Sequence, residues 1–168
     1  MATYEIPSTD GPIKINPLRE SVDHLNVYSM SRSELGRALS NFNGCGVDHP
    51  TLGYFKSLEG AWMYLSRDSI PERIRTLYGA EAKQYGRHPK IENPLSKQQI
   101  LSLSAYRLAQ HPRILEMLRS TDLPITHYYT FGKGIVDGSK SNMFQLKFYR
   151  AIAQGAPLKC ALTDAMLT

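Results

Sequence analysis

The clearest apolar repeat along the chain predicts a helix that begins near Ser57. Its apolar residues recur at intervals of three and four, which places them on one helix face: Leu58, Ala61, Trp62 and Leu65. Glu59 falls at the edge of this face, a position that allows partial desolvation of its carboxyl group, which raises a carboxyl pKa. From the helix pattern alone, an ordinary exposed glutamate is the favoured interpretation.

Ser-x-x-Glu or Ser-x-x-Gln spacing, which lets side chains cap the first turn of a helix, occurs at three places where a helix is expected. It predicts one or two helical turns after Ser31, a helix from Ser69 to about Gly86, and a helix from Ser96 through Gln110. After Pro112 a shorter helix is expected to end between Arg119 and Asp122. The last two helices are expected where Phe144, Phe148 and Ala151 form an apolar stripe, and after Pro157.

Strand patterns are fewer. Alternation over residues 24–29 and the β-branched and aromatic run 124–130 each predict a short strand. The Gly- and Pro-punctuated stretches 43–54 and 132–138 are expected to be loops, and residues 1–23 an extended arm. The pattern therefore predicts an α+β fold: a mostly α-helical single domain over residues 24–168, with a few short strands.

Composition limits the expected cellular location of the protein more than it limits the expected function. The 168 residues carry a net charge of +5, with 10 basic and 5 acidic residues between Arg67 and Arg119, which is a weak sign of a phosphate-bearing partner. Cys45 and Cys160 lack metal-site spacing, so we expect reduced thiols, no metal and no cofactor. No apolar run approaches the ~20 residues that span a bilayer. We expect a cytoplasmic protein with no membrane partner.

The glycine-rich stretch 132–138 invites comparison with phosphate-binding loops, because glycine lets backbone amides approach a phosphate. Neither the dinucleotide-binding pattern nor the P-loop pattern fits it. Lys133 and Lys140 favour an anion slightly, and a plain surface turn explains the glycines equally well.

A set of short motifs, in order, resembles the NADAR family, also called YbiA-like. They span about residues 28–152 and are Leu39-Ser40-Asn41-Phe42, Ser57-Leu58-Glu59, Tyr85-Gly86-Arg87, Leu118-Arg119-Ser120-Thr121-Asp122, and Gly132-x-Gly134 followed by Gly138-x-x-x-Asn142. The resemblance implies an N-glycosidase that cleaves a ribosylated nucleotide or nucleobase. Substrates of the family include ribosylaminopyrimidine phosphates and ADP-ribosylated guanine in nucleic acid.

The resemblance also implies roles for particular residues. Glu59 would be the catalytic carboxylate, stabilising an oxocarbenium-like transition state or moving a proton at the ribose. The implied substrate-binding residues are Ser40, Asn41, Phe42, Trp62, Arg87, Gly132, Lys133, Gly134, Asp137 and Asn142. Among them, Asn41 and Asn142 would bind sugar hydroxyls or amide edges, Arg87 and Lys133 phosphate, and Phe42 and Trp62 a base.

Three positions depart from the family pattern. Ser66 stands where members often carry a lysine, Phe131 replaces the tryptophan of the glycine loop, and Trp62-Met63 replaces an aromatic-Gln pair. Lys56 or Lys83 would have to supply an amine in place of the missing lysine. The alternatives are a noncatalytic module that binds nucleotide, ADP-ribose or nucleic acid, and a protein-interaction domain. The sequence does not indicate an oligomeric state.

Overall fold

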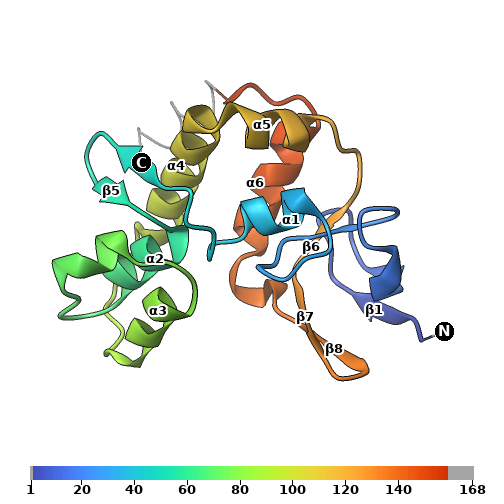
Figure 1. Cartoon of the computed structure of the whole chain (residues 1–168), viewed down its shortest axis with the longest axis horizontal. Helices are drawn as coiled ribbons and strands as arrows, with labels where there is room; N and C mark the ends of the chain where they lie inside the picture. Colours follow the sequence, from blue (N-terminus) through green and yellow to red (C-terminus); the bar gives the residue numbers. More distant parts are fainter. Residues whose placement is uncertain (1, 159–168) are drawn as a thin grey trace. The chain divides into compact units, whose positions relative to one another are not determined.

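Short strands and helices alternate along the chain in this computed structural model, which describes residues 2–158. Within those residues there are six α-helices and eight strands, and the strands pair into four two-stranded sheets (Figure 1). The predicted α+β class is confirmed, with more strands than the few that were expected. The described residues form two compact units: unit 1 contains residues 2–40 and 116–156, and unit 2 contains 41–115 with 157–158.

The N-terminal segment of unit 1 is a packed hairpin. Strands β1 (Tyr4–Ile6) and β2 (Ile13–Ile15) pair antiparallel, and a 3-10 turn, Pro17–Arg19, follows. Ile6 and Ile15 are buried with Tyr128, whereas the sequence favoured an extended arm over a packed element. The apolar residues of the two three-residue strands provide the reason, because each strand ends in an isoleucine that points into this cluster.

Two strands distant in sequence meet at the centre of unit 1. Strand β3 (Leu25–Asn26) pairs in parallel with β6 (Ile125–Thr126), so the strands predicted at 24–29 and 124–130 are both present. The Asn26 side chain then extends this pairing: its Nδ2 donates to the Tyr128 carbonyl (3.0 Å) and its Oδ1 accepts from the Tyr128 amide (2.9 Å).

Strand β7 (Tyr128–Phe131) turns back into β8 (Gly134–Asp137), so most of the expected loop 132–138 is a hairpin strand. A 3-10 turn, Ser139–Ser141, leads into α6 (Met143–Ala153), which packs against β6. The buried side of α6 carries Gln145, Leu146, Tyr149 and Ile152. The predicted stripe of Phe144, Phe148 and Ala151 was wrong, because Ala151 is exposed and the two phenylalanines are only half-buried.

Helix α1 (Glu34–Leu39) confirms the short helix expected after Ser31. Its cap is Ser33 rather than Ser31, and the Ser33 hydroxyl accepts from the Gly36 amide (2.9 Å). Ser31 instead donates its hydroxyl to the buried Glu20 carboxylate. Gly36 lies against the Asn26 carbonyl and the Ser31 side chain, where a Cβ would overlap both.

Unit 2 opens with a second unexpected hairpin. Strands β4 (Val47–His49) and β5 (Gly53–Phe55) pair antiparallel in the stretch expected to be a loop. Arg75 covers this hairpin: its guanidinium lies 4.4 Å from the centroid of the Phe55 ring and donates to the carbonyls of Leu52 and Tyr54. A cation held this way stabilises a short strand that its own three residues would not.

The helices of unit 2 surround a core of their own. Helix α2 (Leu58–Ser66) starts where predicted, and Ser57 caps it by accepting from the Gly60 amide (3.0 Å). The helix expected from Ser69 to Gly86 is three pieces: the 3-10 turn Glu72–Thr76, α3 (Gly79–Lys83) and the 3-10 turn Gln84–Arg87. Gly79 enters α3 at φ +57°, a left-handed conformation that interrupts the continuous helix.

Helix α4 (Ser96–Gln110) has its predicted bounds, although Leu95 rather than Ser96 occupies the cap position and no side chain caps it. Helix α5 (Pro112–Arg119) confirms the shorter helix, with the proline in its first turn. The helix expected after Pro157 lies outside the described residues. Along residues 2–158, no helix combines the length and apolar character needed to cross a membrane.

Candidate functional site

The loop with the sequence Ser40-Asn41-Phe42 is fastened to the first turn of α2, where Glu59 lies. The Glu59 amide donates to the Asn41 carbonyl (2.8 Å), and the Gly79 amide donates to the Phe42 carbonyl (3.2 Å). One loop is thereby bonded to the starts of both α2 and α3. The structure thus brings Asn41 and Phe42, both predicted substrate-binding residues, to Glu59.

The Glu59 carboxyl group at this position has a shifted pKa. Burial raises its pKa, and the positive charge of Lys83 opposes that rise without cancelling it. The carboxyl group makes no hydrogen bond and no ion pair with the residues that the structure describes. A partly buried carboxyl group without a hydrogen-bond partner carries a desolvation cost that a bound ligand can relieve.

Lys83 completes this arrangement. Its Nζ lies 5.6 Å from the centroid of the Phe42 ring, and its charge acts on Glu59. Lys56, the other lysine considered, places its Nζ 5.5 Å from the centroid of Tyr78. We call Asn41, Phe42, Glu59 and Lys83 the Glu59 cluster; it contains an acid, a cation and an aromatic face within one unit.

Two other positions near α2 have structural contacts. The Ser66 hydroxyl donates to the Trp62 carbonyl (2.6 Å), which is a contact within the helix. The Trp62 ring is half-buried and packs against the core cluster that contains Met63, Ile74 and Tyr85. Met63, expected at the flank of the helix, is more deeply buried than Trp62.

Arg87 lies at the end of the 3-10 turn that follows α3 and is exposed. Its guanidinium has no ion pair with any residue in the described part of the chain. An unpaired arginine of this kind is available to an anion, and its planar group can hold two phosphate oxygens at once.

The remaining predicted residues belong to unit 1. Ser40 ends α1 and is buried, and Asp137 accepts from the amide (3.0 Å) and hydroxyl (2.7 Å) of Ser139. Asn142 precedes α6, and its Oδ1 is buried without a hydrogen-bond partner among the described residues. Asp137 therefore orders the turn before α6, while Asn142 keeps an unused acceptor.

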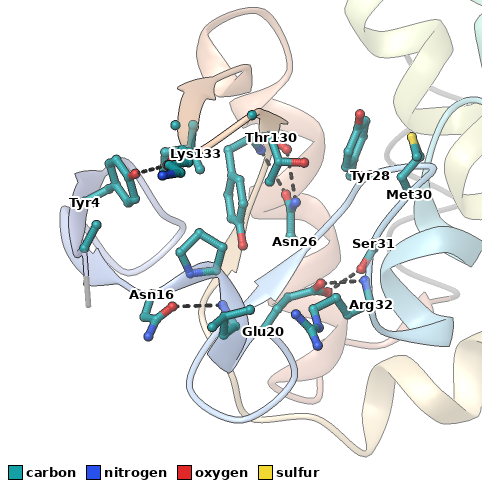
Figure 2. Close-up of a pocket in the computed structure, with 17 residues that line it drawn as sticks. Tyr4, Asn16, Glu20, Asn26, Tyr28, Met30, Ser31, Arg32, Thr130 and Lys133 are labelled. Carbon is teal, nitrogen blue, oxygen red and sulfur yellow. Dashed lines mark hydrogen bonds between the residues drawn. The ribbon is translucent and has the colours of Figure 1, made fainter.

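The glycine segment is a hairpin turn rather than a phosphate cradle before a helix. Phe131 pairs with Gly134, and the two residues between them make the turn, with Gly132 at φ +54°. This turn forms one wall of a pocket of about 390 Å³, and every residue that lines the pocket belongs to unit 1 (Figure 2). Gly132, Lys133 and Gly134 are therefore brought together at one cavity.

Sequence reasoning missed the opposite wall of that pocket, which the N-terminal segment supplies. Tyr4, Asn16 and Glu20 line it (Figure 2). The available signal was the alternation in Tyr4-Glu5-Ile6 and Ile13-Lys14-Ile15, which is typical of two half-buried strands.

Among residues 2–158, no group of three or more His, Cys, Asp and Glu side chains is placed to hold a metal ion. Cys45 is a free thiol, and Cys160 lies outside the described residues.

The chain matches no family model, no curated protein and no solved structure. The NADAR assignment stays a prediction from the ordered motifs.

Proposed function

We propose that this chain is an N-glycosidase of the NADAR type, which hydrolyses the bond between a ribose and a nucleobase or nucleotide base. The observation that carries the proposal is the Glu59 carboxyl group: it is partly buried, has a raised pKa, and makes no hydrogen bond or ion pair with the described residues. The ordered motifs of the sequence supply the family and the substrate class.

Glycosidic hydrolysis needs what this carboxyl group offers. As the C1′–N bond breaks, its electron pair passes to the leaving nitrogen, which takes the proton of Glu59. Water then adds to C1′, and the proton it releases returns to the Glu59 carboxylate, which restores the acid. The negative charge of the carboxylate also stabilises the oxocarbenium-like centre between the two steps.

The rest of the cluster fits a ribosylated ligand. The Phe42 ring offers a face for a base, and the Asn41 amide side chain has the donor and acceptor that sugar hydroxyls need. Lys83 contributes a cation beside Glu59, and Arg87 a second cation in the same unit for phosphate. Phosphorylated ribosyl compounds and ADP-ribosylated nucleic acid are the partners we propose, in a cytoplasmic setting.

The test uses two substrates, DNA that carries ADP-ribosylated guanine and a ribosylaminopyrimidine phosphate. Release of the ribosyl product is followed by chromatography. The Glu59→Gln variant removes the proton and the charge but keeps the shape, so kcat should fall by about 10²-fold or more. Its fold should persist, because the carboxyl group has no described hydrogen-bond partner to lose.

The matched control is Glu81→Gln, the same change at an exposed glutamate of α3. This variant should keep wild-type turnover. Unchanged turnover in Glu59→Gln would remove Glu59 from the mechanism. If the wild-type protein neither binds nor converts either substrate, the glycosidase proposal is wrong.

A noncatalytic binding module is the second candidate, and Ser66 favours it. Family members often carry an amine at this position, whereas here a hydroxyl is bonded to the Trp62 carbonyl. A noncatalytic module should bind ADP-ribose or the modified DNA saturably and release no product. Turnover that depends on Glu59 excludes it.

A further inference from the structure

Three segments of the chain line the pocket of unit 1. They are the turn between β7 and β8, the segment from β1 to Glu20, and the segment from Asn26 to Arg32 (Figure 2). The Tyr4 hydroxyl joins the first two by donating to the Lys133 carbonyl (2.5 Å). The cavity measures about 390 Å³, within the range of small-molecule sites.

Two polar side chains of the pocket are already committed to the protein. The Glu20 carboxylate accepts from the hydroxyls of Ser31 and Ser33 and from the Arg32 amide (2.6 Å). Asn26 uses its amide group on the backbone of Tyr128. These two groups hold the walls in place and leave little capacity for a ligand.

Four other polar groups remain available. The guanidinium of Arg32, the ammonium of Lys133 and the hydroxyls of Tyr28 and Thr130 make no hydrogen bond and no ion pair with residues 2–158. Two cations face one hydrogen-bonded carboxylate, so the lining carries a net positive charge. This charge attracts an anion.

Apolar side chains at the same pocket are left open to solvent. Leu18 is 61% exposed and Met30 is 77% exposed, and both line the cavity. Large apolar side chains around a concave site lose water when a ligand with an apolar body covers them, which favours binding. The flexible thioether of Met30 can adapt to the shape of such a body.

We propose that this pocket is a second site, which binds a small organic anion with an aromatic or apolar body. The cations of Arg32 and Lys133 attract the charged group, and Leu18 and Met30 cover the body. The glycines of the β7–β8 turn let the backbone pass close to the ligand. The observations behind this site are separate from those behind the glycosidase proposal, because all its lining residues belong to unit 1 and Glu59 belongs to unit 2.

Two fluorescent probes separate the contribution of charge from that of apolar contact. 8-Anilinonaphthalene-1-sulfonate carries an anionic group, and N-phenyl-1-naphthylamine has the same aromatic body without it. With the full chain, the sulfonate should saturate at one probe per chain. In the double variant Arg32→Met with Lys133→Met, the affinity for the sulfonate should fall about tenfold, since two attractive charges are lost. The affinity for the neutral probe should change by less than about twofold.

Two further variants complete the design. Lys140→Met with Lys147→Met removes the same charge from exposed positions of unit 1 that do not line the pocket, and it should leave both probes unchanged. Met30→Ala should lower the affinity for both probes, because it removes apolar contact. Thermal melting of each variant confirms that the fold persists.

The proposal is overturned if the sulfonate does not bind saturably, or if its affinity is unchanged when Arg32 and Lys133 are replaced. It is also overturned if replacing Lys140 and Lys147 weakens sulfonate binding as much as replacing Arg32 and Lys133 does. Equal loss of affinity for both probes in the Arg32 and Lys133 variant would overturn it too, because charge would then make no selective contribution.

Discussion

At the scale of single residues, two titratable groups of unit 2 differ in whether they have hydrogen-bond partners. His49 is almost fully enclosed, and both of its ring nitrogens have partners: Nδ1 accepts from the amides of Thr51 and Leu52, and Nε2 lies 2.7 Å from the Ser102 hydroxyl. Glu59 has a raised pKa and no such partner among the described residues. The contrast separates a histidine that fixes a turn from a carboxyl group that is open to a ligand.

His49 gives the protein a pH-dependent stability. Burial lowers its pKa below 6.5, so the folded state favours the neutral ring. Between the folded-state pKa and pH 6.5, the unfolded state therefore binds more protons than the folded state. The contribution is complete above pH 6.5 and is lost as the pH falls through the folded-state pKa. The melting temperature of the wild-type protein should therefore fall between about pH 7 and pH 5.

The His49→Gln variant lacks this titration. It should lose about 1–3 kcal/mol at neutral pH, where the ring's hydrogen bonds are intact, and its melting temperature should depend less on pH than that of the wild type. His88→Gln, at a half-buried histidine, is the control. If the two variants show the same pH dependence as the wild type, His49 does not set it.

At the scale of elements, α1 is held by close packing at one glycine. Its first turn lies against the backbone carbonyl of Asn26 and the side chain of Ser31. The Asn26 side chain donates to the Tyr128 carbonyl, and the Ser31 hydroxyl donates to Glu20. The position of α1 is therefore fixed by the contact between its backbone and β3, with no space for a side chain.

Gly36→Ala should accordingly be costly even though alanine is the better helix former. The added Cβ would overlap a backbone oxygen, so α1 must move, and we expect a loss of about 3 kcal/mol in the free energy of unfolding. Chemical denaturation measures it. The control is Gly134→Ala, where the nearest atom to an added Cβ is 3.7 Å away. A cost below that of the control would contradict this packing.

The elements also show what a sequence pattern can predict. The bounds of α4 and the start of α2 follow from local signals, because a long repeat and a serine cap act over one or two turns. The hairpins β1–β2 and β4–β5 were missed. The alternation in a three-residue strand is brief, and β4–β5 also depends on a distant partner, Arg75.

The same limit applies to the candidate site. The edge position of Glu59 on α2 allowed a partly desolvated carboxyl group but did not distinguish it from an exposed one, and the raised pKa agrees with partial desolvation. Lys83 is 24 positions along the chain, and its effect on Glu59 depends on the turn at Gly79. No local pattern specifies such a pairing.

At the scale of the whole molecule, the net charge of +5 bears on which substrate the proposed glycosidase would take. A small phosphate compound would contact only a few cations of the protein. A nucleic acid would engage several phosphates at once and release their counterions, so its affinity would depend steeply on salt. Salt dependence therefore separates the two substrate classes.

Binding is measured with the Glu59→Gln variant, which should hold the substrate without cleaving it. If the duplex contacts two or more phosphates, its affinity should fall about tenfold or more between about 50 and 200 mM salt. The same DNA with and without ADP-ribose shows which part is recognised. A flat salt response would exclude the nucleic-acid substrate in favour of the small molecule.

The parallel pairing of β3 with β6 has a consequence for the order in which the chain acquires its structure. The two strands are about 100 residues apart, whereas the described elements of unit 2 lie in the continuous stretch 41–115. On the ribosome, unit 2 emerges while β3 still lacks its neighbour. Nascent unit 1 therefore exposes Leu25 and the open edge of β3 until translation has passed β6, and this interval is when a chaperone would be most needed.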